Sequence, residues 1–132
     1  MIAVDTNVLV RVLTGDDPQQ TAAAQSVLAA GRVWIAKTVL LEAAWVLRSL
    51  YGFEEIAIRD AFTKLLGLKN VQAEDAAAVA GALALTVHGI DFADAMHLSS
   101  RPHGAVFLSF DRSLVRRAKR AEAPAVSAVS DY

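Results

Sequence analysis

The sequence predicts an α/β protein in which a parallel sheet of four to five strands lies in a three-layer arrangement, flanked by helices. Short apolar segments typical of strands alternate along the chain with longer segments whose apolar residues recur at helical spacing. The strand segments are apolar at nearly every position, which is typical of strands buried on both faces. With 132 residues the chain has the length of one compact unit, so we expect a single domain over residues 1–132.

The first half of the chain contains two predicted strands and four predicted helices. Asp17 is placed to cap the second helix, Pro18 is its first residue, and Gly31 follows its end. Thr38 is expected to cap the third helix, and Gly52 is expected to end it. The expected order is strand 1–4, helix 6–14, helix 18–30, strand 32–36, helix 39–51 and helix 54–68.

The second half repeats this alternation and brings acidic residues to the ends of strands. Its expected order is strand 70–73, helix 74–88, helix 91–101, strand 105–109, helix 112–122 and strand 123–129. In open parallel sheets, sites lie beyond the carboxyl ends of the strands. Asp5 follows the first strand directly, and Asp111 comes two residues after strand 105–109. We therefore expect both acids at the functional edge of the sheet.

Composition excludes several classes of site and suggests a location. The formal net charge is −1, so nucleic acid would have to bind through a local basic patch. The chain has no cysteine, which excludes disulfides, zinc–thiolate centres and thiol nucleophiles and is compatible with a reducing compartment. We expect a cytoplasmic protein that is not bound to a membrane. The N-terminal residues do not resemble a signal peptide, and the longest apolar run, residues 76–87, is too short to span a bilayer.

Acidic residues near expected helix starts have both structural and functional interpretations. Asp5 and Asp111 could each cap the helix that follows. Asp91 could be a cap, with Asp94 as its partner at the third helical position. Glu42 is the only charged residue between positions 37 and 48 of an apolar helix, so we expect it to be buried. A buried carboxylate needs either a cation or a structural ion partner.

Considered together, these acids favour a metal site. Converging carboxylates repel one another unless a cation neutralises them, and oxygen ligands without cysteine favour Mg²⁺ or Mn²⁺. Such an ion can activate water and polarise a phosphodiester. Asp91, Asp94 and His97 are spaced by three residues and share one face of the predicted helix. His97 is interpreted as a supporting residue and not as a metal ligand.

Four segments of the sequence resemble a known family. The segments "VDTNVLVRVLTGDDPQQ", "TVLLEAAWVLRSLYGF", "GIDFADAMHLSS" and "LSFDRSL" together resemble the PIN domain, and specifically the VapC-type toxins of bacterial toxin–antitoxin pairs. The likeness runs from about residue 2 to residue 120 and implies the PIN-like fold, a parallel sheet with flanking helices. It implies that the catalytic acids are Asp5, Glu42, Asp94 and Asp111, of which Asp5, Asp94 and Asp111 would bind metal.

The resemblance also suggests supporting residues, an activity and partners. Thr6 and Ser109 match positions that often carry a hydroxyl near the metal, and many relatives have threonine in place of Ser109. Asp91 matches a frequent acid whose role is less defined. The implied activity is that of a Mg²⁺- or Mn²⁺-dependent endoribonuclease in which metal-activated water attacks phosphorus in line. The implied partners are an RNA substrate, a VapB-like antitoxin that blocks the acidic site, and a second copy of the chain.

A basic helix is the candidate RNA-binding surface. Five of the thirteen Lys and Arg residues lie between positions 112 and 120. Arg112, Arg116 and Arg120 share one face of the predicted helix, which begins beside Asp111. Phosphate groups could bind there, although an ordinary solvated cationic face has the same pattern.

Other classes fit the sequence less well. A haloacid-dehalogenase-like phosphatase needs a second aspartate two residues after the first, where this chain has Asn7. A receiver domain needs an acceptor aspartate after a central strand and a late lysine, and neither pattern is found. The remaining alternative is a non-catalytic PIN-like RNA- or protein-binding module, which the four retained acids argue against.

Overall fold

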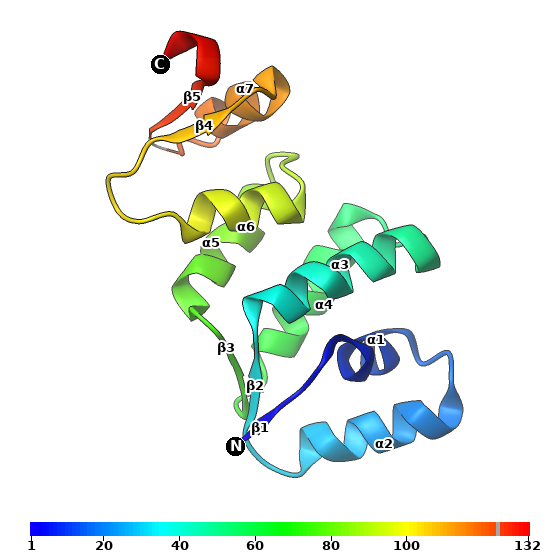
Figure 1. Cartoon of the computed structure of the whole chain (residues 1–132). Helices are drawn as coiled ribbons and strands as arrows, with labels where there is room; N and C mark the ends of the chain where they lie inside the picture. The colour runs from blue at the N-terminus through cyan, green and yellow to red at the C-terminus, as the bar shows by residue number, and fades with distance from the viewer. Residues whose placement is uncertain (124) are drawn as a thin grey trace. The chain divides into compact units, whose positions relative to one another are not determined.

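The computed structural model describes residues 1–123 and 125–132, and every strand pairing in these residues is parallel (Figure 1). The chain divides into two units, Met1–Ala76 and Ala77–Tyr132. Each unit combines helices with parallel strands, so the predicted α/β class is confirmed. The five strands of the described residues lie in a sheet of three in the first unit and a sheet of two in the second.

The sheet of the first unit has its second strand in the centre. Its order is β1-β2-β3, with Val33 of β2 paired to Ile2 on one side and to Val71 on the other. Val33 and Ile35 have no exposed surface, so the central strand forms part of the core. The strands are β1 (Ile2–Ala3), β2 (Val33–Ile35) and β3 (Val71–Ala73).

Four helices accompany this sheet, and α1 contacts both α2 and α3. Asp17 accepts a hydrogen bond from the Gln20 N–H at 3.0 Å and Pro18 begins α2, as predicted. Gly52 ends α3 at φ +70°, a left-handed conformation that favours glycine. The helices are α1 (Thr6–Thr14), α2 (Pro18–Ala29), α3 (Lys37–Tyr51) and α4 (Glu55–Leu66).

The predicted capping of α3 by Thr38 is wrong. The helix begins at Lys37, two residues before the predicted start, and its N-cap residue makes no side-chain capping bond. Instead, the Glu74 carboxylate accepts a hydrogen bond from the Lys37 N–H at 2.9 Å. Glu74 follows β3, so the cap of α3 comes from a residue 37 positions away, where local sequence gives no signal.

The helix predicted from Glu74 also starts later. Glu74 is engaged in capping α3, and Asp75 has φ +52°, a left-handed conformation that is unfavourable for a residue other than glycine. The helix α5 therefore begins at Ala76 and ends at Thr86. It is the most apolar helix of the chain, yet no helix among the described residues is long and apolar enough to cross a membrane.

The second unit places α7 against a two-stranded sheet. Phe107 pairs with Val126 and Ser109 with Ala128, and α7 contacts both strands. The predicted last strand, 123–129, is shorter in the structure, and its Pro124 lies outside the described residues. The elements are α6 (Phe92–Ser100), β4 (Phe107–Ser109), α7 (Arg112–Arg120), β5 (Val126–Ala128) and a 3-10 turn, η1 (Val129–Asp131).

The helices α5 and α6 approach each other closely at a glycine. The Ser99 hydroxyl donates a hydrogen bond to the carbonyl of Ala78. A Cβ atom at Gly81 would lie 2.6 Å from that hydroxyl oxygen, much closer than a normal contact. Glycine at this position therefore permits the hydrogen bond between the two helices.

The expectation that the strands are buried on both faces is wrong for β1 and β4. Ile2 is 41% exposed and Leu108 is 39% exposed. In the described residues both positions of β1 are exposed, and Phe107 and Ser109 of β4 are only half-buried, so neither strand has a fully covered face. By contrast, Val126 and Ala128 of β5 are buried, as predicted for an apolar strand.

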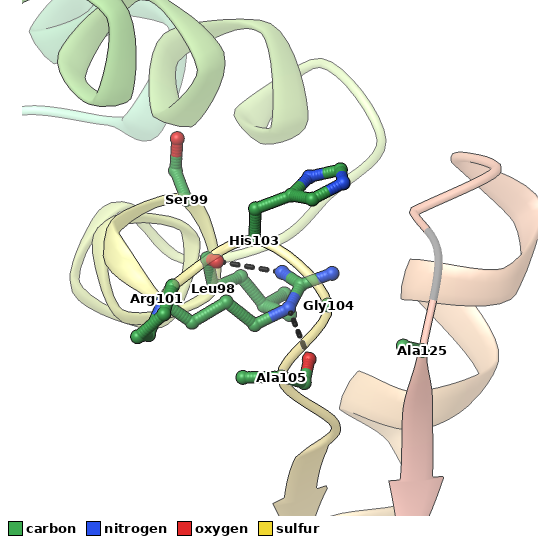
Figure 2. Close-up of a pocket in the computed structure, with 8 residues that line it drawn as sticks. Leu98, Ser99, Arg101, His103, Gly104, Ala105 and Ala125 are labelled. Carbon is green, nitrogen blue, oxygen red and sulfur yellow. Dashed lines mark hydrogen bonds between the residues drawn. The ribbon is translucent and has the colours of Figure 1, made fainter.

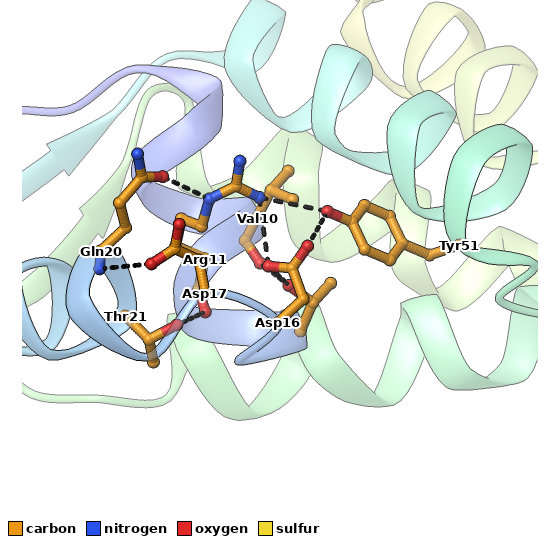
Figure 3. A network of polar contacts seen from close by, with 8 residues as sticks. Val10, Arg11, Asp16, Asp17, Gln20, Thr21 and Tyr51 are labelled. Atoms are coloured by element: carbon orange, nitrogen blue, oxygen red, sulfur yellow. Dashed lines mark hydrogen bonds and ion pairs between the residues drawn. The ribbon is translucent and has the colours of Figure 1, made fainter.

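A polar network joins the ends of α1 and α3 (Figure 3). The Tyr51 hydroxyl donates to Asp16 and accepts from the Arg11 guanidinium at 3.1 Å. Arg11 also donates to Gln20 at 2.6 Å and pairs with Asp16 at 3.2 Å. The bond from Tyr51, more than the Arg11 charge, lowers the pKa of the Asp16 carboxyl. The network thus fixes the turn between α1 and α2 to the last residue of α3.

Replacing Tyr51 with phenylalanine tests this network. The variant loses both hydroxyl hydrogen bonds but keeps the ring, so the melting temperature should fall by about 2–6 °C. The matched control is Tyr132→Phe, because Tyr132 is 79% exposed. Thermal unfolding followed by circular dichroism measures both variants, and equal melting temperatures for both would contradict a role for the network.

Candidate functional site

Three of the acids singled out by the sequence cap helices. Each uses one carboxylate oxygen for a backbone N–H, which supports the capping interpretation. A carboxylate has two oxygens and about four lone-pair positions, so capping leaves acceptor capacity for a cation. Capping and ion binding are therefore compatible. Asp5 caps α1 through the Val8 N–H at 3.3 Å, Asp91 caps α6 through the Ala93 N–H at 3.1 Å, and Asp111 caps α7 through the Leu114 N–H at 3.1 Å.

Ser109 orients the junction between β4 and α7. Its hydroxyl oxygen accepts a hydrogen bond from the Asp111 N–H at 2.9 Å. The Asp111 backbone is thus bound to the last residue of β4, while its side chain is bound to the first turn of α7. This double attachment fixes the direction of the carboxylate at the carboxyl end of the strand.

Thr6 and Glu42 form the corresponding pair in the first unit. The buried Thr6 hydroxyl donates a short hydrogen bond to Oε1 of Glu42. Thr6 directly follows Asp5, the N-cap of α1. The start of α1 therefore carries one candidate acid, Asp5, and contacts a second, Glu42. The expectation that Glu42 is buried is wrong, because α3 buries Ala43 and Leu47 and leaves Glu42 on its exposed side.

Asp94 differs from the capping acids. It lies in the first turn of α6 and is half-buried, while Asp91 occupies the capping position of that helix. Burial raises the pKa of the Asp94 carboxyl, and the neighbouring carboxylates of Asp91 and Asp111 raise it further. His97, one turn later, opposes this rise in pKa. A negative charge at Asp94 is therefore unfavourable in the metal-free protein.

The candidate acids are divided between the two units. Asp5 and Glu42 belong to the first unit, and Asp91, Asp94 and Asp111 belong to the second. Among the residues that the structure describes, no group of three or more His, Asp or Glu side chains could hold a metal ion. The donor set still fits a hard divalent cation, because carboxylate and hydroxyl oxygens are its preferred ligands. The ligand set implied by the resemblance stays a prediction.

The basic helix α7 contains arginines with different contacts. Arg112 donates to the Ser130 hydroxyl at 2.7 Å and pairs with Asp131 at 3.7 Å. Arg117 donates to the carbonyl of Gly89 at 2.9 Å. Arg116 and Arg120 are exposed and make no hydrogen bond or ion pair with the part of the chain that the structure describes. The predicted RNA-binding face therefore combines one anchored arginine with two unanchored ones.

Sequence reasoning missed several residues that organise these elements. Glu74 and Asp75 follow β3 in the same way that Asp5 follows β1, and Lys37 lies beside them after β2. Lys37 pairs with Asp75 at 3.2 Å. The pair of acids directly after the predicted strand 70–73 was the available signal. Arg117 had no such signal, because its partner is a backbone carbonyl 28 positions away.

Comparison with known proteins identifies a family. The model of the PIN domain matches residues 2–120. PIN domains are generally nuclease modules that use divalent metal ions, and membership of the family suggests RNA binding. No curated protein and no solved structure gives a significant match.

The raised pKa of Asp94 predicts a pH-dependent effect on stability. An unfolded aspartate titrates at about 3.9, and the folded protein loses stability as the pH rises from there through the raised pKa of Asp94. Asp94→Asn removes this loss, so the metal-free variant should be more stable than wild type at pH 7. The gain should disappear near pH 3, below the ordinary pKa of an aspartate, where Asp94 is largely protonated in both the folded and the unfolded protein.

Urea unfolding in EDTA between pH 3 and pH 7 measures this difference. The exposed acid Asp60 provides the control variant Asp60→Asn, which should change stability little at either pH. A difference between Asp94→Asn and wild type that stays constant with pH would show that the ionised carboxylate is not disfavoured.

Proposed function

The chain belongs to the PIN domain family, and we propose that it is a Mg²⁺- or Mn²⁺-dependent endoribonuclease, the VapC-type toxin of a toxin–antitoxin pair. The family match over residues 2–120 carries this proposal, because all four candidate acids lie within the matched region. The match extends across both units, which supports treating residues 1–132 as one PIN domain. A cytoplasmic site of action is part of the proposal.

Asp5, Asp94 and Asp111 are the proposed metal ligands, and Glu42 completes the catalytic acids. Three observations support the assignment. Asp5 and Asp111 each use one oxygen for capping and have a second for an ion. The Thr6 hydroxyl holds Glu42 in one orientation. The charge of Asp94 is disfavoured without a cation, and a bound cation would favour it.

A divalent ion held by these carboxylates would lower the pKa of water and would stabilise the negative charge that develops on the phosphodiester. The protein supplies orientation. Ser109 fixes Asp111 through the backbone, and Thr6 fixes Glu42 through its side chain. Asp91 caps the helix that carries Asp94, so its proposed role is to support that helix and not to react. Hydrolysis then needs no nucleophilic side chain, in accordance with a chain that lacks cysteine.

The exposed cationic face of α7 is the proposed RNA-binding surface. It starts beside Asp111, and phosphate groups of an RNA backbone are the ligands that arginine binds best in this setting. All three arginines, Arg112, Arg116 and Arg120, are exposed, but Arg112 already pairs with Asp131. We therefore expect Arg116 and Arg120 to contribute more to RNA binding than Arg112.

A VapB-like antitoxin and a second copy of the chain are the proposed protein partners. Both follow from the resemblance to VapC-type toxins. Exposed apolar residues on α3 support a protein-binding surface, since Trp45 is 63% exposed and Leu50 is 69% exposed.

An RNA cleavage assay tests the proposed activity. Purified protein free of antitoxin should cleave RNA with Mg²⁺ or Mn²⁺ and stop in EDTA. Asp94→Asn should reduce the cleavage rate by more than about 100-fold. Even substitution of a residue that only supports a metal ligand typically lowers metal affinity or activity 10–100-fold. Asp60→Asn should cleave like wild type. Undiminished cleavage in EDTA would exclude a metal mechanism, whereas RNA binding without cleavage would support the non-catalytic module.

Salt dependence tests the basic helix. Removing one arginine that neutralises a phosphate of single-stranded RNA should flatten the slope of log affinity against log salt by about 0.7. We expect this change for Arg116→Gln and for Arg120→Gln, and a smaller one for Arg112→Gln. Fluorescence anisotropy with labelled RNA in EDTA measures the slopes. If all three variants keep the wild-type slope, α7 is an ordinary solvated face.

A further inference from the structure

Arg117 differs from the other cationic residues of α7 in what it binds. Its guanidinium Nη1 donates to the Gly89 carbonyl at 2.9 Å, across 28 positions of the sequence. A charged donor makes a stronger hydrogen bond than a neutral one. Arg116, the preceding residue, is exposed and makes no such bond within the residues that the structure describes. Two adjacent arginines of one helix therefore have different roles.

The acceptor of this bond lies at the entrance to α6. Gly89 is followed by the buried Ile90 and then by Asp91, which caps the helix. Gly89 has φ +78°, a left-handed conformation that favours glycine. A Cβ atom there would lie 3.8 Å from Nε and 3.9 Å from Cδ of Arg117, so the arginine side chain runs alongside this turn. Arg117 thus holds the segment that positions the start of α6.

A second arginine binds the other end of the same helix. Arg101 follows α6 and donates from Nη1 to the Leu98 carbonyl at 2.6 Å and from Nε to the Ala105 carbonyl at 3.1 Å (Figure 2). Ala105 belongs to the loop that leads into β4, whose last residue, Ser109, binds the Asp111 backbone. Both ends of α6 are thereby attached to the segments before and after Asp111.

We propose that Arg117 is a positioning residue for the metal site, fixing Asp94 of α6 relative to Asp111 at the start of α7. The inference rests on the proposed function, in which these two acids bind the same ion. Both acids, Gly89 and Arg117 belong to the second unit, and the Arg117 bond joins α7, which Asp111 caps, to the turn before α6, which carries Asp94. Loss of the Arg117 bond frees the entrance of α6 to shift, which moves one ligand relative to the other.

If Arg117 acted only through its positive charge, its removal would change the metal affinity in the opposite direction. Removing a positive charge near a cluster of acids lowers the local potential, so it should strengthen the binding of a cation. The loss of a positioning bond should instead weaken cation binding. Substitution of a residue that orients a metal ligand typically lowers metal affinity 10–100-fold. The direction of the change in Mn²⁺ affinity therefore distinguishes the two roles.

Isothermal titration of the full-length protein with Mn²⁺, well below the melting temperature, provides the test. Arg117→Gln should weaken Mn²⁺ binding about 10-fold. Arg116→Gln, the charge-matched control, should leave it unchanged or slightly stronger. Arg117→Lys retains an N–H donor on a long side chain and should restore most of the affinity. Melting in EDTA checks that each variant is folded, and Arg117→Met, which keeps the aliphatic stem beside Gly89, is a second variant without the bond.

RNA binding provides the complementary readout. In EDTA, Arg116→Gln should flatten the salt dependence of RNA affinity, and Arg117→Gln should leave it close to that of wild type. Mn²⁺ affinity of Arg117→Gln that equals or exceeds that of wild type would overturn the positioning role. A wild-type protein that binds no Mn²⁺ would instead overturn the proposed function, so the two failures are distinguishable.

Discussion

The hydrogen bond between an aspartate and the first turn of a helix is the interaction on which the arrangement of both units depends. Asp5 makes it for α1, and Asp91 and Asp111 make it for α6 and α7. Such a cap is worth about 1 kcal/mol and fixes where the helix begins. It also fixes the direction of the carboxylate, because the side chain must reach a backbone N–H two or three residues ahead. Helix formation and the orientation of acidic groups are thus consequences of the same bond.

The two candidate acids that do not cap a helix have different surroundings. Glu42 is held by the Thr6 hydroxyl, and Asp94 lies among other carboxylates in a half-buried position. The unfavourable charge of Asp94 is the kind of local cost that proteins retain where a ligand compensates for it. Two arginines of the second unit, Arg117 and Arg101, bind the backbone carbonyls of Gly89 and Ala105. They hold the backbone and leave the acids available.

Local signals in the sequence predicted those parts of the fold that depend on neighbouring residues. The bounds of α1, the start of α2 at Pro18 and the end of α3 at Gly52 follow from turn and cap residues beside them. The start of α3 could not be predicted, because its cap comes from Glu74. The sequence of a helix that is apolar on nearly every side does not show which of its faces is buried. The exposure of Trp45 and Glu42 on α3 therefore required the structure.

The candidate site was predictable as a set of acids but not as a set of roles. Spacing identified Asp91 and Asp94 as neighbours, yet only the structure shows that Asp91 is the cap and that Asp94 has the raised pKa. The match to the PIN domain supports the family and leaves the metal ligands a prediction. Bonds to backbone carbonyls, such as that of Arg117, have no complementary side chain and so leave no pattern in a single sequence.

The contact between α5 and α6 has an evolutionary consequence. A methyl group at Gly81 would collide with the Ser99 hydroxyl, and removing that hydroxyl would leave the Ala78 carbonyl without its donor. Neither position can change freely while the other stays the same, so their substitutions should be non-additive. Evolutionary change at Gly81 and Ser99 would have to pass through an intermediate sequence. That intermediate would either separate the two helices or break the hydrogen bond between them. Since α6 carries Asp94, a proposed metal ligand, selection on the proposed site would extend to a glycine of the neighbouring helix.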